Sequence, residues 1–226
     1  MPTINGRNTD GYVQSYLQNN WPDLRQDTGS QFNVDTNDAS DNDPILLYHT
    51  TGGRGTSFGI KRAFFDFNTS GITSTLTSAT LNIRGYSNND LDVIAVKSDQ
   101  GGSLSTADFQ AIEGAEEEFA LSDGSGAGTL NGATGVTVYS AKFTSWTTSG
   151  WNSAAITAVG LSDITSEDDW RFCLMDYDYD FLDIEPPEAS ASNGLYWADD
   201  ASYKPYIEYV VAGAVTDNAT FFGANF

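Results

Sequence analysis

Short runs of alternating apolar and polar residues, separated by turn residues, are the feature that most limits what this chain can fold into. In the segment 79–85, Ala79, Leu81 and Ile83 fall on one side and polar residues on the other, the period of two of a half-buried strand. The segment 91–96 is apolar almost throughout, which favours a strand covered on both faces. Turn pairs such as Gly52-Gly53 separate the runs. We therefore expect strands at 11–17, 31–34, 45–49, 61–67, 75–85, 91–97, 136–143, 170–179, 194–197 and 205–211.

Only two segments favour a helix. Ser105 precedes the segment 106–112, and Asp108 stands three residues after it, the spacing of a capping box. The segment 152–164 alternates small and apolar residues and favours a helical turn more weakly. The sequence therefore predicts an all-β fold, a single antiparallel β-sandwich that is jelly-roll-like, with one or two short helical turns and a C-terminal extension. We expect residues 1–212 to form the sandwich domain and residues 213–226 to form a docking arm.

The charge of the chain excludes one class of partner. There are 31 acidic and 10 basic residues, a formal net charge of -21. Proteins that bind nucleic acid neutralise phosphates with Lys and Arg, so we expect no nucleic-acid partner. The first ten residues hold no basic stretch followed by an apolar run, and no later segment offers about 18 consecutive apolar residues. We therefore expect neither a secretory signal peptide nor a membrane span.

The inventory of reactive side chains argues against an enzyme. His49 is the only histidine and Cys173 the only cysteine, so a zinc site and an internal disulfide are both excluded. No Gly-x-Ser-x-Gly segment occurs, which removes the motif of the α/β-hydrolase nucleophile. Cys173 lies in an apolar run and is expected to be a small buried hydrophobe. The sequence therefore predicts no catalytic residue.

Carboxylates are densest in the segment 167–188. If the run from Asp176 to Phe181 is one extended strand, its alternation places Asp176, Asp178 and Asp180 along one face and three aromatic residues on the other. Oxygen ligands with that spacing could hold Ca²⁺, although the run does not fit an EF-hand. The alternatives are an exposed acidic strand face above a buried aromatic face, and an acid/base pair for glycoside cleavage.

Aromatic residues near loops and strand ends give a second indication of function. Rings exposed at such places could stack on sugars or fill the pocket of a partner, while the alternative is ordinary core packing. The candidate glycan contacts are Trp146, Trp151, Tyr196 and Trp197, with Tyr203 nearby.

Three phenylalanines end the chain. Phe221, Phe222 and Phe226 follow the last expected strand, and each costs about 2 kcal/mol when it is left in water rather than buried. They are the candidate partner-binding residues. Either they return to their own sandwich or they cross to a neighbouring subunit, which would make the arm an assembly device.

Several of these strands resemble the DNRLRE-type β-sandwich, some members of which are carbohydrate-binding modules. That family has an Arg-x-Phe-x-x-Phe-Asp strand, a Ser-x-Ala-Thr-Leu-like strand after it, and Arg/Lys-Pro before its terminal strand. The resemblance covers roughly residues 10–211 and implies the sandwich fold, but it carries over no sugar-binding residue. The similar positions here are Asp10–Val13, Arg62, Phe65–Phe67, Ser78–Leu81 and Lys204-Pro205.

A closer similarity is to structural proteins of tailed bacteriophages. It implies a virion component and assigns no catalysis to the shared segments. The segments are Gly59–Arg62, Gly85–Asn89, Ile94–Ser98, Thr106–Phe109, Cys173–Asp180 and Gly194–Asp199.

Together these observations predict a non-enzymatic virion protein, assembled in the host cytoplasm. We expect it to decorate or cement a capsid by binding the major capsid protein or another virion protein, as a homotrimer whose arm docks on a neighbour. The alternative is a glycan-binding or receptor-binding module of a tail fibre or other surface appendage, with calcium assisting at the aspartates. A polysaccharide depolymerase is a third hypothesis, and it needs a pair of carboxylates in a groove.

Overall fold

The alternating segments form strands, and every pairing between them is antiparallel. The computed structural model describes residues 1–226 except 19, 26, 28, 30, 35–38, 53–54, 114–135 and 214–226. The strands are β1 (Thr3–Asn5), β2 (Gly11–Gln18), β3 (Gln31–Val34), β4 (Ser40–Gly52), β5 (Gly55–Asn68), β6 (Leu76–Asn89), β7 (Val93–Lys97), β8 (Trp151–Ala155), β9 (Asp169–Asp176), β10 (Ala189–Tyr196) and β11 (Tyr206–Val211). The helical segments are α1 (Trp21–Arg25), η1 (Thr106–Gln110), α2 (Ala158–Ser166) and the π-helical turn η2 (Tyr177–Phe181).

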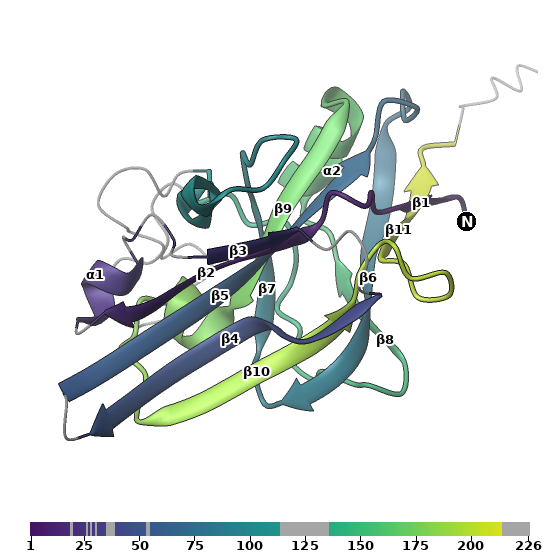
Figure 1. The fold of residues 1–226 in the computed structure, drawn as a ribbon. Coiled ribbons are helices and arrows are strands. Elements are labelled where there is room, and N and C mark those ends of the chain that lie inside the picture. The colour runs from purple at the N-terminus through teal and green to yellow at the C-terminus, as the bar shows by residue number, and fades with distance from the viewer. Residues whose placement is uncertain are drawn as a thin grey trace, which may run out of the picture.

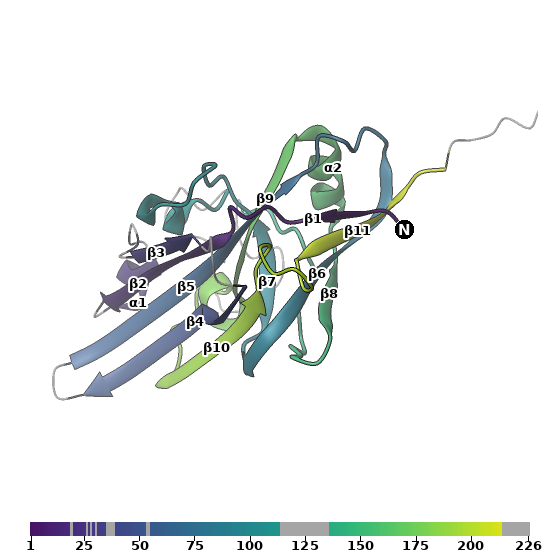
Figure 2. The same ribbon diagram turned by 45° about the vertical axis from the view of Figure 1, so that its right-hand side comes forward.

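Two long strands, β5 and β6, each pair with different strands along their length, and this arranges the sheet in layers. β5 pairs with β4 through residues 55–61 and with β9 through residues 63–68. β6 pairs with β11 and β8 in its first part and with β10 in its last. Figures 1 and 2 show the result: β2, β5, β4 and β10 lie side by side at one end, and β6, β8, β11 and β1 lie at the other. The all-β sandwich predicted from the sequence is confirmed.

An aromatic core fills the space between the layers. Phe65 of β5 stacks on Phe172 of β9 with ring centroids 5.1 Å apart, and the Trp197 ring lies 5.3 Å from Phe65. Trp170 packs on Phe172 at 4.8 Å. All of these side chains are fully buried. Since aromatic side chains bury large areas and contribute strongly to core energies, this group holds β5, β9 and the end of β10 together.

The expected strand at 136–143 is wrong. Instead of one ladder, this segment makes single bridges, from Val138 and Phe143 to β7 and from Ser140 to Ile156. Its backbone alternates between two partners, so no continuous pairing forms. The expected strand at 170–179 is also too long, because β9 ends at Asp176.

The helical predictions are partly confirmed. η1 begins after Ser105, whose backbone N–H and hydroxyl donate to an Asp108 carboxylate oxygen at 2.6 and 2.9 Å. The segment 152–164 divides into β8 and the first part of α2, which Thr157 caps by accepting the Gly160 amide at 3.2 Å. α1 was not expected. At the other end of the chain, β11 ends at Val211, and most of the predicted arm lies outside the described residues.

Candidate binding surface

A cluster of aromatic side chains lies on the outer face of the layer that contains β6, β8 and β11. On β6, Leu81 and Ile83 point into the core, so Arg84 lies on the opposite face. Trp151 of β8 pairs directly with Arg84, and Tyr206 of β11 pairs with Asn82, which puts both rings on that face. Tyr86, Tyr196 and Tyr203 complete the cluster. We call the set of Arg84, Tyr86, Trp151, Tyr196, Tyr203 and Tyr206 the Trp151 patch.

Three of the four ring pairs in the Trp151 patch meet edge to face, and the Tyr196 and Tyr203 rings are tilted at 55°. The Trp151 ring lies 4.9 Å from the Tyr206 ring at 81° and 6.4 Å from the Tyr203 ring at 67°. Tyr196 links Tyr203, at 4.8 Å, to Tyr86, at 5.4 Å. The Arg84 guanidinium lies 4.9 Å from the centre of the Tyr203 ring. Tyr86 and Tyr203 remain 43% and 37% exposed, so part of the cluster is open to a ligand.

A polar pocket adjoins Trp151. Its volume is about 470 Å³, and Thr144, Ser145, Thr147 and Ser153 supply hydroxyl groups to its lining. The loop beside it is fixed by Asn152, which accepts the Thr147 N–H at 2.7 Å and donates to the Thr147 carbonyl at 3.0 Å.

Gly85 allows this loop to approach β6. A Cβ atom at Gly85 would lie 2.2 Å from the Thr147 carbonyl oxygen and 2.9 Å from Nε1 of Trp146. The close approach holds one wall of the pocket against the sheet, and Trp151 stands between the pocket and the tyrosines of the patch.

Of the four predicted glycan contacts, two belong to the Trp151 patch, Trp146 lines the pocket with little exposed surface, and Trp197 lies in the core. Trp151 and Tyr196 are in the Trp151 patch. Trp146 is 6% exposed and donates its indole N–H to the Gly194 carbonyl at 3.2 Å, while Trp197 is fully buried against Phe65. The prediction that Trp146 and Trp197 present exposed rings is therefore wrong, because both complete the core, as the alternative of core packing anticipated.

Three members of the patch were not singled out from the sequence. Arg84 and Tyr86 continue the outward alternation of the segment 79–85, and Tyr206 begins the last strand. The period-two alternation could have identified Arg84 and Tyr86, because residues 80, 82, 84 and 86 fall on one face of a strand. The pairing of β6 with β8 and β11 brings them to Trp151, and that pairing cannot be read from one strand.

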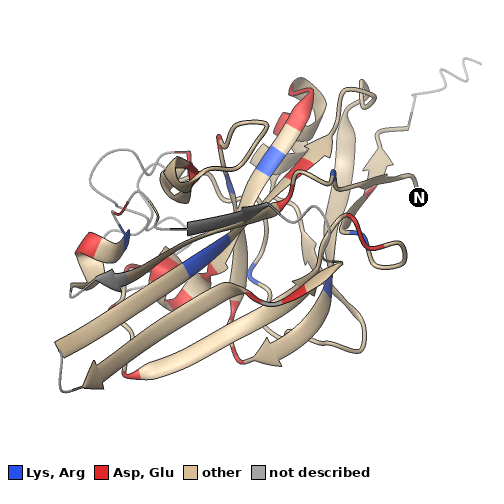
Figure 3. Ribbon diagram, in the orientation of Figure 1, with Lys and Arg blue, Asp and Glu red and all other residues tan. Residues whose placement is uncertain are grey.

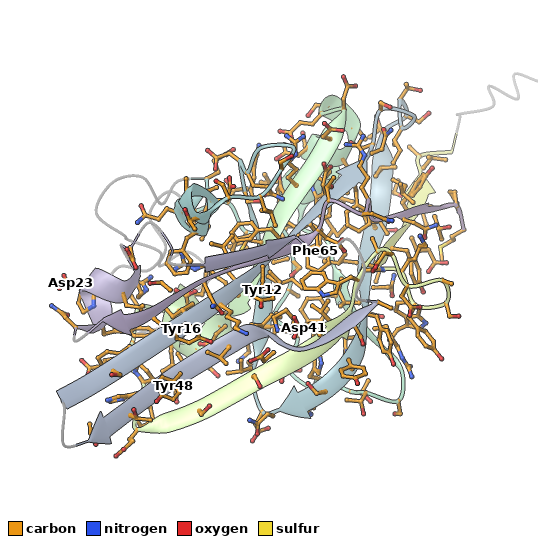
Figure 4. The ribbon with its side chains drawn as sticks, viewed as in Figure 1. Tyr12, Tyr16, Asp23, Asp41, Tyr48 and Phe65 are labelled. Carbon is orange, nitrogen blue, oxygen red and sulfur yellow. The ribbon has the colours of Figure 1, made fainter. Side chains whose placement is uncertain are left out.

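A second aromatic surface lies on β2, β4 and β5. Tyr16 and Tyr48 both pair with Gly59, from opposite sides, and Tyr12 lies four residues before Tyr16 on β2. A Cβ atom at Gly59 would lie 2.2 Å from Cδ1 of the Tyr16 ring, so this ring lies against the backbone of β5. Figure 4 shows the three tyrosines along the near face of these strands, with Asp41 beside them. We call this the tyrosine face.

The tyrosine face surrounds a buried lysine. Lys61 is 6% exposed, pairs with Asp43 at 2.9 Å and lies 4.6 Å from the centre of the Tyr12 ring. Burial, followed by the Asp43 carboxylate, raises the pKa of Tyr16 to about 12. Burial and the neighbouring Asp43 also raise the pKa of Asp41 above its usual range. The fold holds these groups together around the ion pair of Lys61 and Asp43.

The three aspartates predicted as calcium ligands do not share a face. The chain turns after Asp176, whose carboxylate accepts the amides of Tyr179 and Asp180 at 2.7 and 3.1 Å. Asp178 is half-exposed and lies 3.6 Å from Lys142. Asp180 is fully buried. The extended geometry behind the calcium prediction is therefore wrong, as is the alternative of an exposed acidic strand face. Within the described part of the chain, no group of three His, Cys, Asp or Glu side chains is arranged to hold a metal ion.

Asp180 forms the centre of a buried ionic cluster instead. Arg62 donates to its two carboxylate oxygens at 2.8 and 2.7 Å, and Arg25 donates to its backbone carbonyl at 2.8 Å. Arg25 also pairs with Asp183, and Arg62 reaches the Phe109 carbonyl at 2.6 Å. Burial alone would raise the pKa of Asp180, but Arg62 and then Arg25 hold it below its usual range. The cluster ties β5, α1, η1 and η2 together.

The single histidine and the single cysteine are both buried. His49 Nδ1 lies 2.7 Å from the Pro186 carbonyl oxygen, and its ring packs at a tilt against Phe58 with ring centroids 4.3 Å apart. Cys173 is fully buried in β9, as predicted, and burial raises the pKa of its thiol. The third predicted group, Phe221, Phe222 and Phe226, lies outside the described residues.

Comparison with known proteins adds no relative: no protein-family model matches the chain, and no curated protein matches it with significant similarity. The similarities to bacteriophage structural proteins and to DNRLRE-type sandwiches stay predictions. Among the described residues, none of the helices has the length and apolar composition needed to cross a bilayer.

Proposed function

We propose that this chain is a non-enzymatic structural component of a bacteriophage virion, a decoration or cement protein that binds the outer shell of a capsid as a homotrimer. The observation that carries this proposal is the Trp151 patch, which keeps Tyr86 and Tyr203 partly exposed beside Trp151 on the outer face of the sandwich. Trp, Tyr and Arg are the residues that dominate binding energy at protein interfaces, and all three occur here.

The charge supports an outward position on the shell. Acidic residues are distributed over strands, turns and loops of the described chain, as Figure 3 shows. A strongly negative exterior repels packaged DNA and keeps many copies soluble before assembly. The tyrosine face and the predicted arm at 213–226 offer further contacts for neighbouring copies.

Particle composition and reattachment test this proposal. Purified virions should contain hundreds of copies of the chain, whereas a tail component would be present in a handful. Particles that lack the chain should bind it when it is added back, and Trp151→Ala together with Tyr203→Ala should weaken this binding at least tenfold. Val159→Ala is the matched control, because Val159 is an exposed apolar residue on α2, outside the patch. Unchanged attachment of the double variant would contradict this role of the patch.

A glycan-binding module is the second candidate, and the polar pocket beside Trp151 favours it. Sugar sites combine an aromatic ring, which stacks on a pyranose face, with hydroxyl and amide groups that bind its oxygens. The volume of about 470 Å³ falls within the range of small-ligand pockets. A glycan array probed with the wild-type chain and with Trp151→Ala tests this function. Binding that depends on Trp151 supports it, and absence of binding to every glycan argues for the structural role alone.

A further inference from the structure

Two basic residues differ from the others in this acidic chain. Seven basic side chains form ion pairs: Arg7, Arg25, Lys61, Arg62, Lys97, Lys142 and Arg171. Among the basic residues that the structure describes, only Arg84 and Lys204 have no carboxylate within 4.0 Å. With 31 acidic residues available, a cation without a carboxylate partner is the exception, and both exceptions adjoin the Trp151 patch.

Arg84 is partly buried, and one of its nitrogen atoms lacks a hydrogen-bond partner. Its guanidinium lies over the Tyr203 ring, and its Nε atom is buried without a hydrogen-bond partner. An unpaired buried donor on a charged group is costly. The Nε atom itself is shielded from solvent, so a ligand would bind the terminal nitrogens of the guanidinium, which are not among the buried unpaired atoms. An anionic oxygen would bind them most strongly, because charge-assisted hydrogen bonds are about twice as strong as neutral ones.

Lys204 adds to the positive charge at the same place. It follows Tyr203 directly along the chain, so it brings a second positive charge next to the patch.

Two carboxylates near the patch lie beyond ion-pair distance of Arg84 and Lys204. Asp200 accepts the amides of Ser202 and Tyr203 at 2.7 Å each. Glu208 pairs with Thr80, four residues from Arg84 along β6, a distance of about 13 Å. Within the described residues, the Trp151 patch therefore brings together two cations that have no carboxylate within 4.0 Å, in a chain of net charge -21.

We propose that the Trp151 patch and its pocket bind an anionic saccharide, with the sugar ring against Trp151 and Tyr203 and a carboxylate or phosphate group held by Arg84, assisted by Lys204. This inference rests on the second candidate function and names its ligand class. A small pocket lined by hydroxyl groups beside an aromatic ring fits a sugar better than a protein segment, and the two cations without carboxylate partners specify its charge. Arg84 is suited to this task because its planar guanidinium matches carboxylate and phosphate oxygens in pairs.

Matched glycan probes test the charge preference. The intact chain would be titrated with a uronic-acid hexasaccharide and its carboxyl-reduced form, and with a phosphorylated mannoside and plain mannoside. We expect at least tenfold tighter binding of one charged probe than of its neutral match, and the successful pair identifies the carboxylate or the phosphate. Arg84→Gln should abolish this preference, because it should weaken binding of the charged probe at least tenfold more than binding of the neutral one. Arg84→Lys, which keeps the charge, should restore part of it, and Tyr48→Ala on the tyrosine face should have no effect.

The outcomes separate this inference from the glycan function on which it rests. Glycan binding that depends on Trp151 but is equal for charged and neutral probes keeps the function and overturns the charge preference. Binding that survives Trp151→Ala, or absence of binding to all probes, overturns both. Because Arg84 lies in a strand, unfolding midpoints of Arg84→Gln and Arg84→Lys would be compared first. If Arg84→Gln unfolds, Lys204→Gln and the salt dependence of wild-type binding take its place: a charged probe whose affinity does not fall with rising NaCl contradicts the proposal.

Discussion

Asp180 stabilises the segment after β9 through its buried carboxylate. It is fully buried and is held by the Arg62 guanidinium through two hydrogen bonds. Removing one partner of a buried ion pair leaves the other charge uncompensated, which typically costs about 3–5 kcal/mol. We therefore expect Asp180→Asn to lower the free energy of unfolding by about this amount, measured by urea denaturation at pH 7.

Asp178→Asn is the control for this prediction. Asp178 lies two residues away, is half-exposed and has only a 3.6 Å contact with Lys142. Exposed ion pairs contribute about 0–1 kcal/mol, so this variant should unfold close to the wild type. Equal losses in the two variants would show that the buried cluster does not control stability.

Asp176 should make the free energy of unfolding fall as the pH rises, whereas a salt-bridged carboxylate makes it rise. Burial raises its folded pKa to about 7, and the amides of Tyr179 and Asp180 offset this only in part. Its unfolded pKa is about 3.9, so between these values the folded state binds the proton and the unfolded state does not. This contribution is complete below the unfolded pKa, decreases as the pH rises between the two values and is gone above the folded pKa.

We therefore expect the free energy of unfolding of Asp176→Asn to rise relative to that of the wild type as the pH increases from 5 to 8, by about 1–3 kcal/mol. Asn keeps an oxygen that can accept the two amides and does not titrate in this range. Urea unfolding of both proteins at four or five pH values measures the difference. A difference that stays constant over this range would show that the Asp176 carboxyl ionises as easily in the folded chain as in the unfolded one.

At the scale of elements, Gly59 determines how β2 lies against β5. A Cβ atom there would lie 2.2 and 2.5 Å from two atoms of the Tyr16 ring, so Gly59→Ala must displace the ring. Overpacking of this kind typically costs about 1–3 kcal/mol. We expect thermal or urea unfolding to show that loss for Gly59→Ala, and a much smaller loss when Tyr16→Ala is already present.

The matched control for Gly59 is Gly71→Ala. A Cβ atom at Gly71 meets no atom within 4 Å, so its effect should stay within about 0.5 kcal/mol. The double-mutant cycle with Tyr16 isolates the contact itself. Additive effects of Gly59→Ala and Tyr16→Ala would mean that the ring does not depend on the glycine.

The sequence predicted elements better than it predicted which elements meet. The alternation of Ala79, Leu81 and Ile83 was sufficient to place β6, because period two is a local property. The turn after Asp176 could not be read from alternation, since it depends on a side chain accepting two amides and on Arg62 arriving from β5. Likewise Trp151 was noticed and Arg84 was not, because only strand pairing brings them together.

At the scale of the whole molecule, charge opposes folding more than ion pairs support it. The basic residues are so few that even complete pairing of all 10 would leave 21 of the 31 acidic residues uncompensated. Like charges at this density repel one another in the compact state. Salt also weakens ion pairs such as Lys97 with Glu167 at 2.8 Å and Arg7 with Asp169 at 2.6 Å. Such pairs are fewer than the acidic residues that have no basic partner.

We therefore expect salt to stabilise this protein. Raising NaCl from about 10 mM to about 200 mM shortens the Debye length from about 30 Å to below 10 Å, which screens repulsion between distant carboxylates more than attraction between touching pairs. The melting temperature at pH 7 should rise by several degrees, a change that corresponds to about 1–2 kcal/mol for a domain of this size. Calorimetry in NaCl and in KCl separates screening from ion-specific effects, and sulfate is avoided because it strengthens apolar burial by itself. A melting temperature that falls with added chloride would mean that ion pairs, rather than the excess of carboxylates, control the electrostatics of the fold.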